Sequence, residues 1–356
     1  MPSVSYLFKR ICSMNYKAMF DRVDIVKEKC DKSKPAIFCD MIWCGLRYGA
    51  GYVDYDVIGF YKLNSAQRKT MLTRGINNKF VKQLNNKASW HTLDNKNEFN
   101  EIFSKYLKRD WIYPVSENKE KSIEWIKAHP VFFAKPNDGT CGKNIEKISI
   151  TDKEWNSDYE KIYNHLVENK IELLEEPIKQ ADKMNKLNDS SVNTVRMVSV
   201  MNEANEVTVL TTFARIGNGK CVDNFNSGGM TAKVNVDTGV IEEAAVNKAG
   251  ELYEKHPITG TTIKGFQMPY WNEAKEMVKR AAKLSTHVRY VGWDVGMSEK
   301  GPVLIEGNQF PGHDIYQVAE KMKDGELGVL PMFEAAISGK NKNAKLTKYV
   351  KLKNKM

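Results

Sequence analysis

The sequence predicts an α+β protein with a mainly helical N-terminal region. Residues 1–30 place apolar side chains at helical spacing with Lys and Arg between them. Residues 192–236 contain several short runs typical of consecutive strands. In the stretch 291–308, apolar residues first alternate with small or polar ones, and a second apolar run follows a turn. This period-2 pattern predicts a β-hairpin.

Length and composition are those of an ordinary globular chain. At 356 residues it is long enough for two or three domains of ~150 residues each. It is 42% hydrophobic and 28% charged, and no run approaches the ~18 apolar residues of a membrane span. Lys9, Arg10 and Lys17 interrupt the apolar N-terminus, which argues against a signal peptide. The six cysteines lack metal-ligand spacing, so we expect reduced thiols and a cytoplasmic protein.

The net charge of +10 is concentrated at the C-terminus. Residues 340–356 hold seven lysines and no acid, which leaves 47 basic and 44 acidic side chains elsewhere. Such a tail could contact an anionic membrane surface or nucleic acid, but a solvated terminal helix or frayed end is more common. We expect no nucleic-acid partner and keep membrane-surface contact through the tail as an alternative.

Local patterns predict the remaining elements. Helices are expected at 37–48, 65–90, 98–108, 152–169 and 270–286, with another starting at 309–314. The aromatic stretch after the glycines near residue 50 could be strand or helix. Strands are expected at 131–135, 145–150, 171–174, 192–201, 207–215, 222–223 and 230–236.

The hairpin carries a possible metal site. If its turn centres near Lys300, Asp294 lies opposite Glu306, and Asn308 shares the face of Glu306. Opposed carboxylates repel each other unless one is protonated or a cation lies between them. Two carboxylates and an amide oxygen suit Mg²⁺. A solvated hairpin tip is the alternative.

A loop with two glycines follows the predicted strand that ends in Lys135. Gly139 and Gly142 could turn backbone N–H groups toward an anion, because glycine adopts the required φ values without penalty. The loop does not match the P-loop pattern. A plain turn is the alternative. The position of Lys135 directly before the loop favours phosphate binding.

Two arginines lie at strand positions. Arg196 and Arg215 could share an anionic guest, because guanidinium binds carboxylate or phosphate with paired hydrogen bonds. A surface ion pair across the strands is the alternative. The strand exit at 175–180 could present its backbone to a base and an acid to a ribose, or could be a plain loop.

The order of these motifs resembles that in the ATP-grasp superfamily. The amino-acid sequences of the motifs resemble those of its sugar-transfer-associated branch. The matching stretches are Leu93-Asp94-Asn95-Lys96, Phe133-Ala134-Lys135-Pro136 with the glycine loop, Leu174-Glu175-Glu176-Pro177-Ile178, Ser191-Val192-Asn193-Thr194-Val195-Arg196, Asp223-Asn224 with Gly228-Gly229, Gly292-Trp293-Asp294 and Ile305-Glu306-Gly307-Asn308. Seven motifs in the correct order are specific for the fold, though not for the substrate.

The resemblance implies an ATP-grasp fold, in which two α+β subdomains grip ATP between them. On this basis we expect a mainly helical region at 1–115, a lid subdomain at 116–180, a catalytic subdomain at 181–338 and a Lys-rich tail at 339–356.

The resemblance also implies roles for individual residues. Lys96 and Lys135 would contact nucleotide phosphates, and the loop with Gly139, Thr140 and Gly142 would close over the β/γ-phosphates. The backbone of Glu175, Glu176 and Ile178 would meet adenine. Asp294, Glu306 and Asn308 would hold Mg²⁺, with Mn²⁺ as an alternative. Arg196, Arg215 and Lys135 would be catalytic.

The implied function is an ATP-dependent carboxylate–amine ligase that works through an acylphosphate and releases ADP. Its substrate would be an amino acid, a sugar or a cell-surface polysaccharide precursor. A small-molecule kinase on the same scaffold and a non-enzymatic binding protein using the basic tail are the alternatives.

One position departs from the related D-alanine-type ligases, which carry an Arg two residues before the metal Asp. This chain has Gly292 there, so either Arg196 or Arg215 must supply that charge. His313 could assist the amine, or could make a local hydrogen bond at a helix start.

Overall fold

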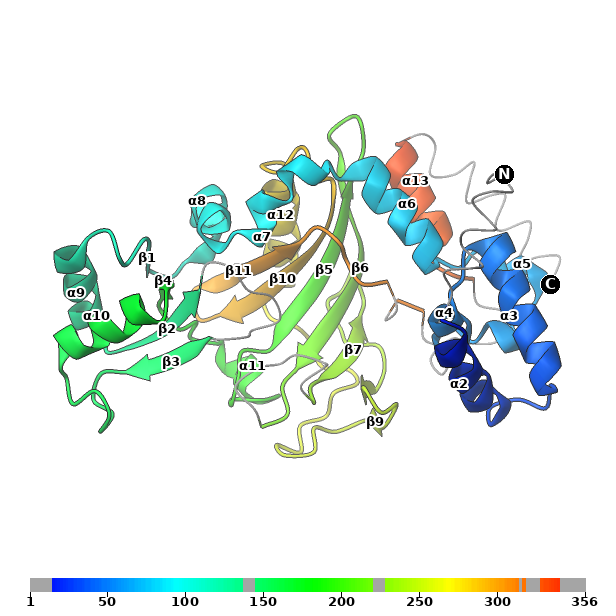
Figure 1. Cartoon of the computed structure of the whole chain (residues 1–356), viewed down its shortest axis with the longest axis horizontal. Coiled ribbons are helices and arrows are strands. Elements are labelled where there is room, and N and C mark those ends of the chain that lie inside the picture. Colours follow the sequence, from blue (N-terminus) through cyan, green and yellow to red (C-terminus); the bar gives the residue numbers. More distant parts are fainter. Residues whose placement is uncertain (1–14, 137–144, 220–227, 314–315, 318–326, 340–356) are drawn as a thin grey trace. The chain divides into compact units, whose positions relative to one another are not determined.

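The computed structural model describes residues 15–136, 145–219, 228–313, 316–317 and 327–339 (Figure 1). The chain divides into two compact units. The first, here called the helical unit, comprises Met1–Asn85, Asn202–Glu206 and Pro311–Met356. The second, here called the sheet unit, comprises Asn86–Met201 and Val207–Phe310.

Short helices build the described part of the helical unit. They are α2 (Tyr16–Lys27), α3 (Lys34–Tyr48), α4 (Tyr52–Val57), η1 (Phe60–Lys62), α5 (Ser65–Arg68), α6 (Arg74–Leu84) and α13 (Leu330–Ser338). Ser33 caps the start of α3 by accepting a hydrogen bond from the Ala36 N–H. Gly49 ends α3 at φ 67°, a conformation that glycine adopts without strain. Buried apolar side chains from α2, α3 and α4, among them Val26 and Ile37, form one core.

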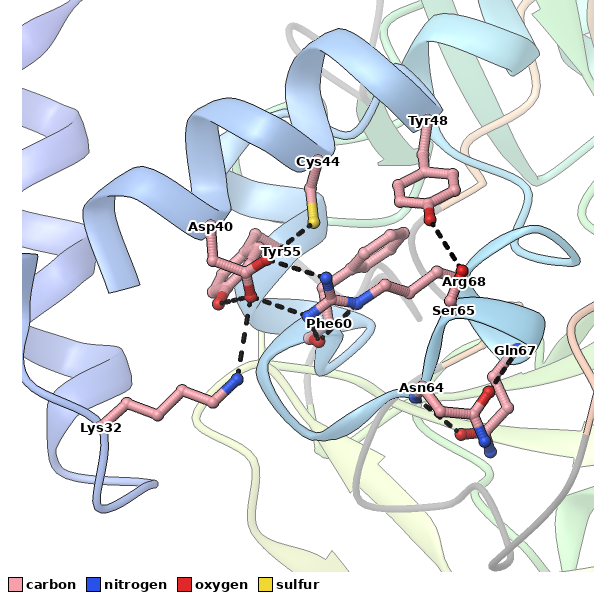
Figure 2. A network of polar contacts seen from close by, with 10 residues as sticks. All are labelled: Lys32, Asp40, Cys44, Tyr48, Tyr55, Phe60, Asn64, Ser65, Gln67 and Arg68. Carbon is pink, nitrogen blue, oxygen red and sulfur yellow. Dashed lines mark hydrogen bonds and ion pairs between the residues drawn. The ribbon is translucent and has the colours of Figure 1, made fainter. Parts of the chain in front are cut away.

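A polar network centred on Asp40 joins α3 to α4, η1 and α5 (Figure 2). Arg68 donates to both carboxylate oxygens of Asp40, at 2.8 and 2.7 Å. The Tyr55 hydroxyl donates to Asp40 at 2.7 Å, and Arg68 also donates to the Phe60 carbonyl. The Asp40 carboxylate and the Arg68 guanidinium therefore both have hydrogen-bond partners within the helical unit.

The sheet unit contains a four-stranded sheet in the order β1-β4-β2-β3. Its strands are β1 (Trp111–Ile112), β2 (Val131–Pro136), β3 (Glu146–Ser149) and β4 (Ile171–Glu175). Two helices, α9 (Lys119–Ala128) and α10 (Tyr159–Glu168), contribute Ile126, Ile162 and Leu166 to the core that this sheet forms with them. One apolar face of each helix is thereby buried.

The sheet unit also contains a seven-stranded sheet in the order β11-β10-β5-β6-β7-β8-β9. Its strands are β5 (Thr194–Met201), β6 (Val207–Ile216), β7 (Met230–Val234), β8 (Ala245–Asn247), β9 (Leu252–Tyr253), β10 (Tyr290–Ser298) and β11 (Gly301–Asn308). Every neighbouring pair in it is antiparallel. The predicted strands over 192–201, 207–215 and 230–236 are confirmed within a few residues.

Helices α8 (Lys96–Leu107) and α12 (Trp271–Ala282) share a core with this larger sheet. Trp293 on β10 is fully buried, and its ring lies edge-on to Phe103 of α8 with 5.3 Å between centroids. Gly307 on β11 is close to α8 and to the residues just before it, because a Cβ there would lie 3.4 Å from Phe99 and 2.9 Å from Leu93 Cδ2. The α8 side of β10 and β11 is therefore closed by packing. The remaining short helices of this unit are η2 (Lys87–Ser89), α7 (His91–Asp94) and α11 (Asp182–Asn185).

Several expected elements differ from the structure. The helix expected at 65–90 is divided among α5, α6 and η2. The helix expected at 152–169 begins only at Tyr159, because Asn156 and Ser157 adopt positive φ in a turn. Residues 309–313 are not helical, and β1, β8 and β9 were not expected. The strand expected at 222–223 lies outside the described residues.

None of the helices within the described ranges combines the length and the apolar character needed to cross a membrane.

Candidate functional site

Four charged side chains share one face of the larger sheet. Glu306, Asp294, Arg196 and Arg215 lie on β11, β10, β5 and β6, which are consecutive strands. Asp294 pairs directly with Glu306 on one side and with Arg196 on the other. Arg215 pairs with Thr194, two residues before Arg196, and therefore points to the same face. We call these four residues the charged face.

The expected opposition of Asp294 and Glu306 is confirmed, although the turn is shorter than predicted. Ser298 pairs with Gly301, so a regular ladder would place Ile305 opposite Asp294. The register shifts by one residue between Asp294 and Val295, and Ile305 is the additional residue on β11. This β-bulge places Glu306 on the face of Asp294.

Two arginines hold the Asp294 carboxylate, which is only 3% exposed. Arg196 binds both oxygens, with Nη2 at 3.0 Å from Oδ2, and Arg215 Nη1 lies 2.6 Å from the same oxygen. Burial alone would raise the pKa of Asp294, but the two arginines bring it well below its usual range. Asp294 is therefore ionised, and both arginines contact it.

Glu306 has the opposite electrostatic character. Solvent reaches its side chain, although protein atoms surround it on most sides. This partial desolvation and the adjacent, hydrogen-bonded Asp294 raise the pKa of Glu306 to about 7. Asn308 shares its face and donates to Glu306 Oε1 at 3.3 Å. A carboxyl that ionises near neutrality lies directly beside a permanently ionised one.

This donor set fits a hard divalent cation. Asp294, Glu306 and Asn308 offer carboxylate and amide oxygens on one face, which suit Mg²⁺ when water and phosphate oxygens complete its shell. Within the described ranges, no three His, Cys, Asp and Glu side chains cluster closely enough to hold a metal by themselves.

A second charged cluster surrounds Glu175, the last residue of β4. Its buried carboxylate accepts from Asn100 at 2.8 Å and from Arg109 at 3.0 Å, and it also binds the Lys135 ammonium. Burial alone would raise the pKa of Glu175, but Arg109, Lys135 and Asn100 hold it well below its usual range. We call these four residues the Glu175 cluster.

The Lys96 side chain reaches the end of β2, the strand that carries Lys135. The Lys96 ammonium donates to the Pro136 carbonyl at 3.0 Å, next to Lys135 in the chain. Lys96 is also the first residue of α8, whose N-terminus attracts anions. The predicted phosphate-contacting residues Gly139, Thr140 and Gly142 follow this point but lie outside the described residues.

The segment expected to meet adenine leaves β4 beside the Glu175 cluster. The Glu176 N–H already donates to the Asp110 carbonyl at 2.8 Å, so this group has a partner within the protein. A cavity of about 110 Å³ lies next to Glu176 and Ile178. Because typical ligand pockets enclose ~300–1,000 Å³, this cavity could take only part of a nucleotide.

Sequence reasoning missed Arg109 and Asn100, which follow no recognisable motif and become significant only through their contacts with Glu175. His313 belongs to the helical unit, where its Nε2 lies 2.9 Å from Asp54 Oδ1. This pairing spans 259 positions, so the contact that the structure describes for the His313 side chain is long-range.

A family model described as sugar-transfer associated ATP-grasp matches residues 75–325 of the chain. No curated protein matches it. One similar solved structure is the ATP-grasp ligase PsnB complexed with a minimal precursor, at 11% identity and TM-score 0.42, covering 74% of this chain and 68% of that one.

Two further solved structures show comparable similarity. The N5-carboxyaminoimidazole synthetase from Staphylococcus aureus complexed with ADP is 12% identical, with TM-score 0.40 and coverages of 62% and 46%. The VanG D-Ala:D-Ser ligase from Enterococcus faecalis is 13% identical, with TM-score 0.39 and coverages of 74% and 63%. Similarities this low carry no information about the substrate of this chain.

Proposed function

Because the chain belongs to the sugar-transfer associated ATP-grasp family, we propose that it is an ATP-dependent carboxylate–amine ligase. ATP and Mg²⁺ would be its cofactors, ADP and phosphate its by-products, and an amide its product. The carboxylate would belong to an amino acid, a sugar or a cell-surface polysaccharide precursor.

The charged face is the observation that supports this proposal. Transfer of a phosphoryl group to a carboxylate brings two anions together, so charge neutralisation and positioning limit the reaction. Arg196 and Arg215 supply two guanidinium groups within reach of one point on the sheet. Asp294 and Glu306 supply acidic ligands beside them. Bound Mg²⁺ would neutralise phosphate charge and align the reacting oxygen atoms.

The arginines must change partners during such a reaction. Both bind Asp294 in this structure, so either one can contact a substrate carboxylate only by giving up part of that contact. Both arginines reach the same carboxylate. Either can therefore supply the positive charge that an Arg provides in D-alanine-type ligases at the position of Gly292. We propose that Arg196 and Arg215 share this role.

The nucleotide phosphates would bind at the end of β2, which carries Lys135 and which the Lys96 side chain contacts. These two ammonium groups and the N-terminus of α8 combine positive charge at the end of β2. Adenine would contact the backbone after Glu175, through the carbonyl of Glu176 and the backbone of Ile178. The Glu175 carboxylate itself is buried by its cluster, so its part is to orient Lys135.

Product analysis tests this proposal. Purified protein is incubated with ATP, Mg²⁺ and pairs drawn from a panel of amino acids, amino sugars and sugar acids. We expect ADP and phosphate in equal amounts, and an amide only when both partners are present. AMP with pyrophosphate would exclude the acylphosphate route, and a stable phosphorylated product formed without an amine would identify a kinase.

Removal of residues 340–356 serves as the control in that assay. A ligase should keep its turnover without the lysine-rich tail, because the proposed chemistry uses none of these lysines. Loss of function on truncation would favour a binding protein that acts through its tail.

A further inference from the structure

The bulge at Ile305 decides whether the two acids of the charged face meet. Leu304 pairs with Val295, and Glu306 pairs with Asp294, so Ile305 has no partner of its own on β10. A bulge leaves one residue unpaired and disrupts the local ladder, so contacts from outside the ladder can stabilise it. Without it, regular alternation would turn Glu306 to the opposite face of the sheet.

Arg109 contacts the strand directly at this point. Its side chain, 4% exposed, lies in the connection between α8 and β1. Its Nη1 donates at 2.9 Å to the carbonyl of Leu304, the residue immediately before Ile305. Its Nη2 donates at 3.0 Å to Glu175 Oε1. One guanidinium therefore binds both the edge of the bulge and the carboxylate that ends β4.

We propose that Arg109 is a positioning residue that holds the Ile305 bulge and thereby keeps Glu306 opposite Asp294. The planar guanidinium presents its donors at fixed angles, so it can hold two partners in one geometry. Glu175 in turn orients Arg109, because Asn100 and Lys135 hold the same carboxylate. The consequence for metal binding rests on the proposed function, whereas the support of the bulge does not.

The neighbouring Lys108 provides a matched control. It also reaches the β10–β11 hairpin, where its ammonium donates to the Lys300 carbonyl at 2.8 Å. This contact lies at the exposed turn and not at the bulge. Lys108→Met therefore removes a cation and a hairpin contact without affecting the support of Ile305.

Hydrogen exchange on the full chain without ligands tests the support of the bulge. Amides of residues 303–307 should exchange at least ~10-fold faster in Arg109→Lys and Arg109→Met than in the wild type, because local opening becomes easier. Lys108→Met should leave them unchanged. Arg109→Lys retains a cation for Glu175, so it tests the Leu304 contact even if Arg109→Met folds poorly. Unchanged exchange in Arg109→Lys would overturn the proposal.

Binding of Mn²⁺ in the presence of ADP, followed by electron paramagnetic resonance, tests the consequence for the charged face. Loss of a group that orients metal ligands typically weakens metal binding by about 10-fold to 100-fold. We expect this loss in Arg109→Lys, with ADP affinity in the absence of metal within about threefold of wild type. Equal weakening of both affinities would indicate a purely structural role and contradict the proposal. If wild type binds neither ADP nor Mn²⁺, the proposed function fails, while hydrogen exchange still decides the role of Arg109.

Discussion

The Asp40 network and the charged face both place an aspartate against an arginine, yet their balance of charge differs. Arg68 binds Asp40 through two hydrogen bonds, Tyr55 donates a third, and the Lys32 ammonium lies 3.8 Å from one of its oxygens, but no second acid lies opposite Asp40 in this network (Figure 2). Burial alone would raise the pKa of Asp40, but these hydrogen bonds bring it below its usual value. Asp294 has two arginines, and a second acid lies opposite it with a raised pKa.

This difference distinguishes a self-contained structural cluster from the cluster that we propose to be functional. Cys44 also contacts Asp40, and burial raises the pKa of its thiol to about 12, so the thiol is unreactive near neutrality. The Asp40 network joins several helices and needs no further ligand. On the charged face, a carboxyl that ionises near neutrality remains open to solvent, an arrangement suited to binding a cation.

The largest effect is expected for Asp294→Asn. Turnover of ATP should fall at least ~100-fold, because the charge beside the transferring group is disturbed. The protein should also lose roughly 3 kcal/mol of stability, because Arg196 and Arg215 would lose their buried counter-charge. Relief of the repulsion from Glu306 would by itself predict little unfolding, but loss of the two arginine contacts outweighs it. ADP release and urea unfolding measure the two effects, and unchanged turnover would refute the metal assignment.

Asp40→Asn is the matched substitution in the helical unit and should have a smaller effect. The variant keeps the shape of the side chain but weakens the bonds to Arg68 and Tyr55, at a cost of roughly 1–3 kcal/mol. ATP turnover per folded molecule should stay within about twofold of wild type. A loss comparable to that of Asp294→Asn would show that the comparison between the two clusters does not hold.

The smallest effect is expected for Glu306→Gln, which should change how the stability of the fold depends on pH. A folded-state pKa of about 7 means that protonated Glu306 stabilises the ligand-free fold. This contribution is complete below the ordinary pKa of about 4.5 and is lost as pH rises through 7. The variant cannot ionise, so its melting temperature should equal that of wild type at pH 4 and exceed it at pH 8.

Glu175→Gln is the control for that measurement, because the pKa shift of Glu175 is opposite in direction to that of Glu306. The pKa of Glu175 is lowered, so its ionised form stabilises the fold above the ordinary pKa and this contribution is lost at acidic pH. The variant should therefore be less stable than wild type at pH 8. Equal pH profiles for wild type and Glu306→Gln would exclude a raised pKa at Glu306.

Local sequence patterns were sufficient for the elements with clear periodicity. The short runs over 192–201 and 207–215 predict β5 and β6, and the apolar stripe over 98–108 predicts most of α8. They failed where the backbone departs from regular geometry. Asn156 and Ser157 at positive φ delay the start of α10, and the short strands β1, β8 and β9 depend on pairing with distant partners.

The sequence by itself determined the family, the antiparallel pairing of the hairpin that carries Asp294 and Glu306, and the strands that carry the two arginines. Only the tertiary structure showed that Arg196 and Arg215 both bind Asp294, and that Arg109 links Glu175 to the bulge. The physical reason is the separation of the contacting residues along the sequence. Periodicity is a property of neighbouring residues, whereas these contacts join residues 66 to 195 positions apart.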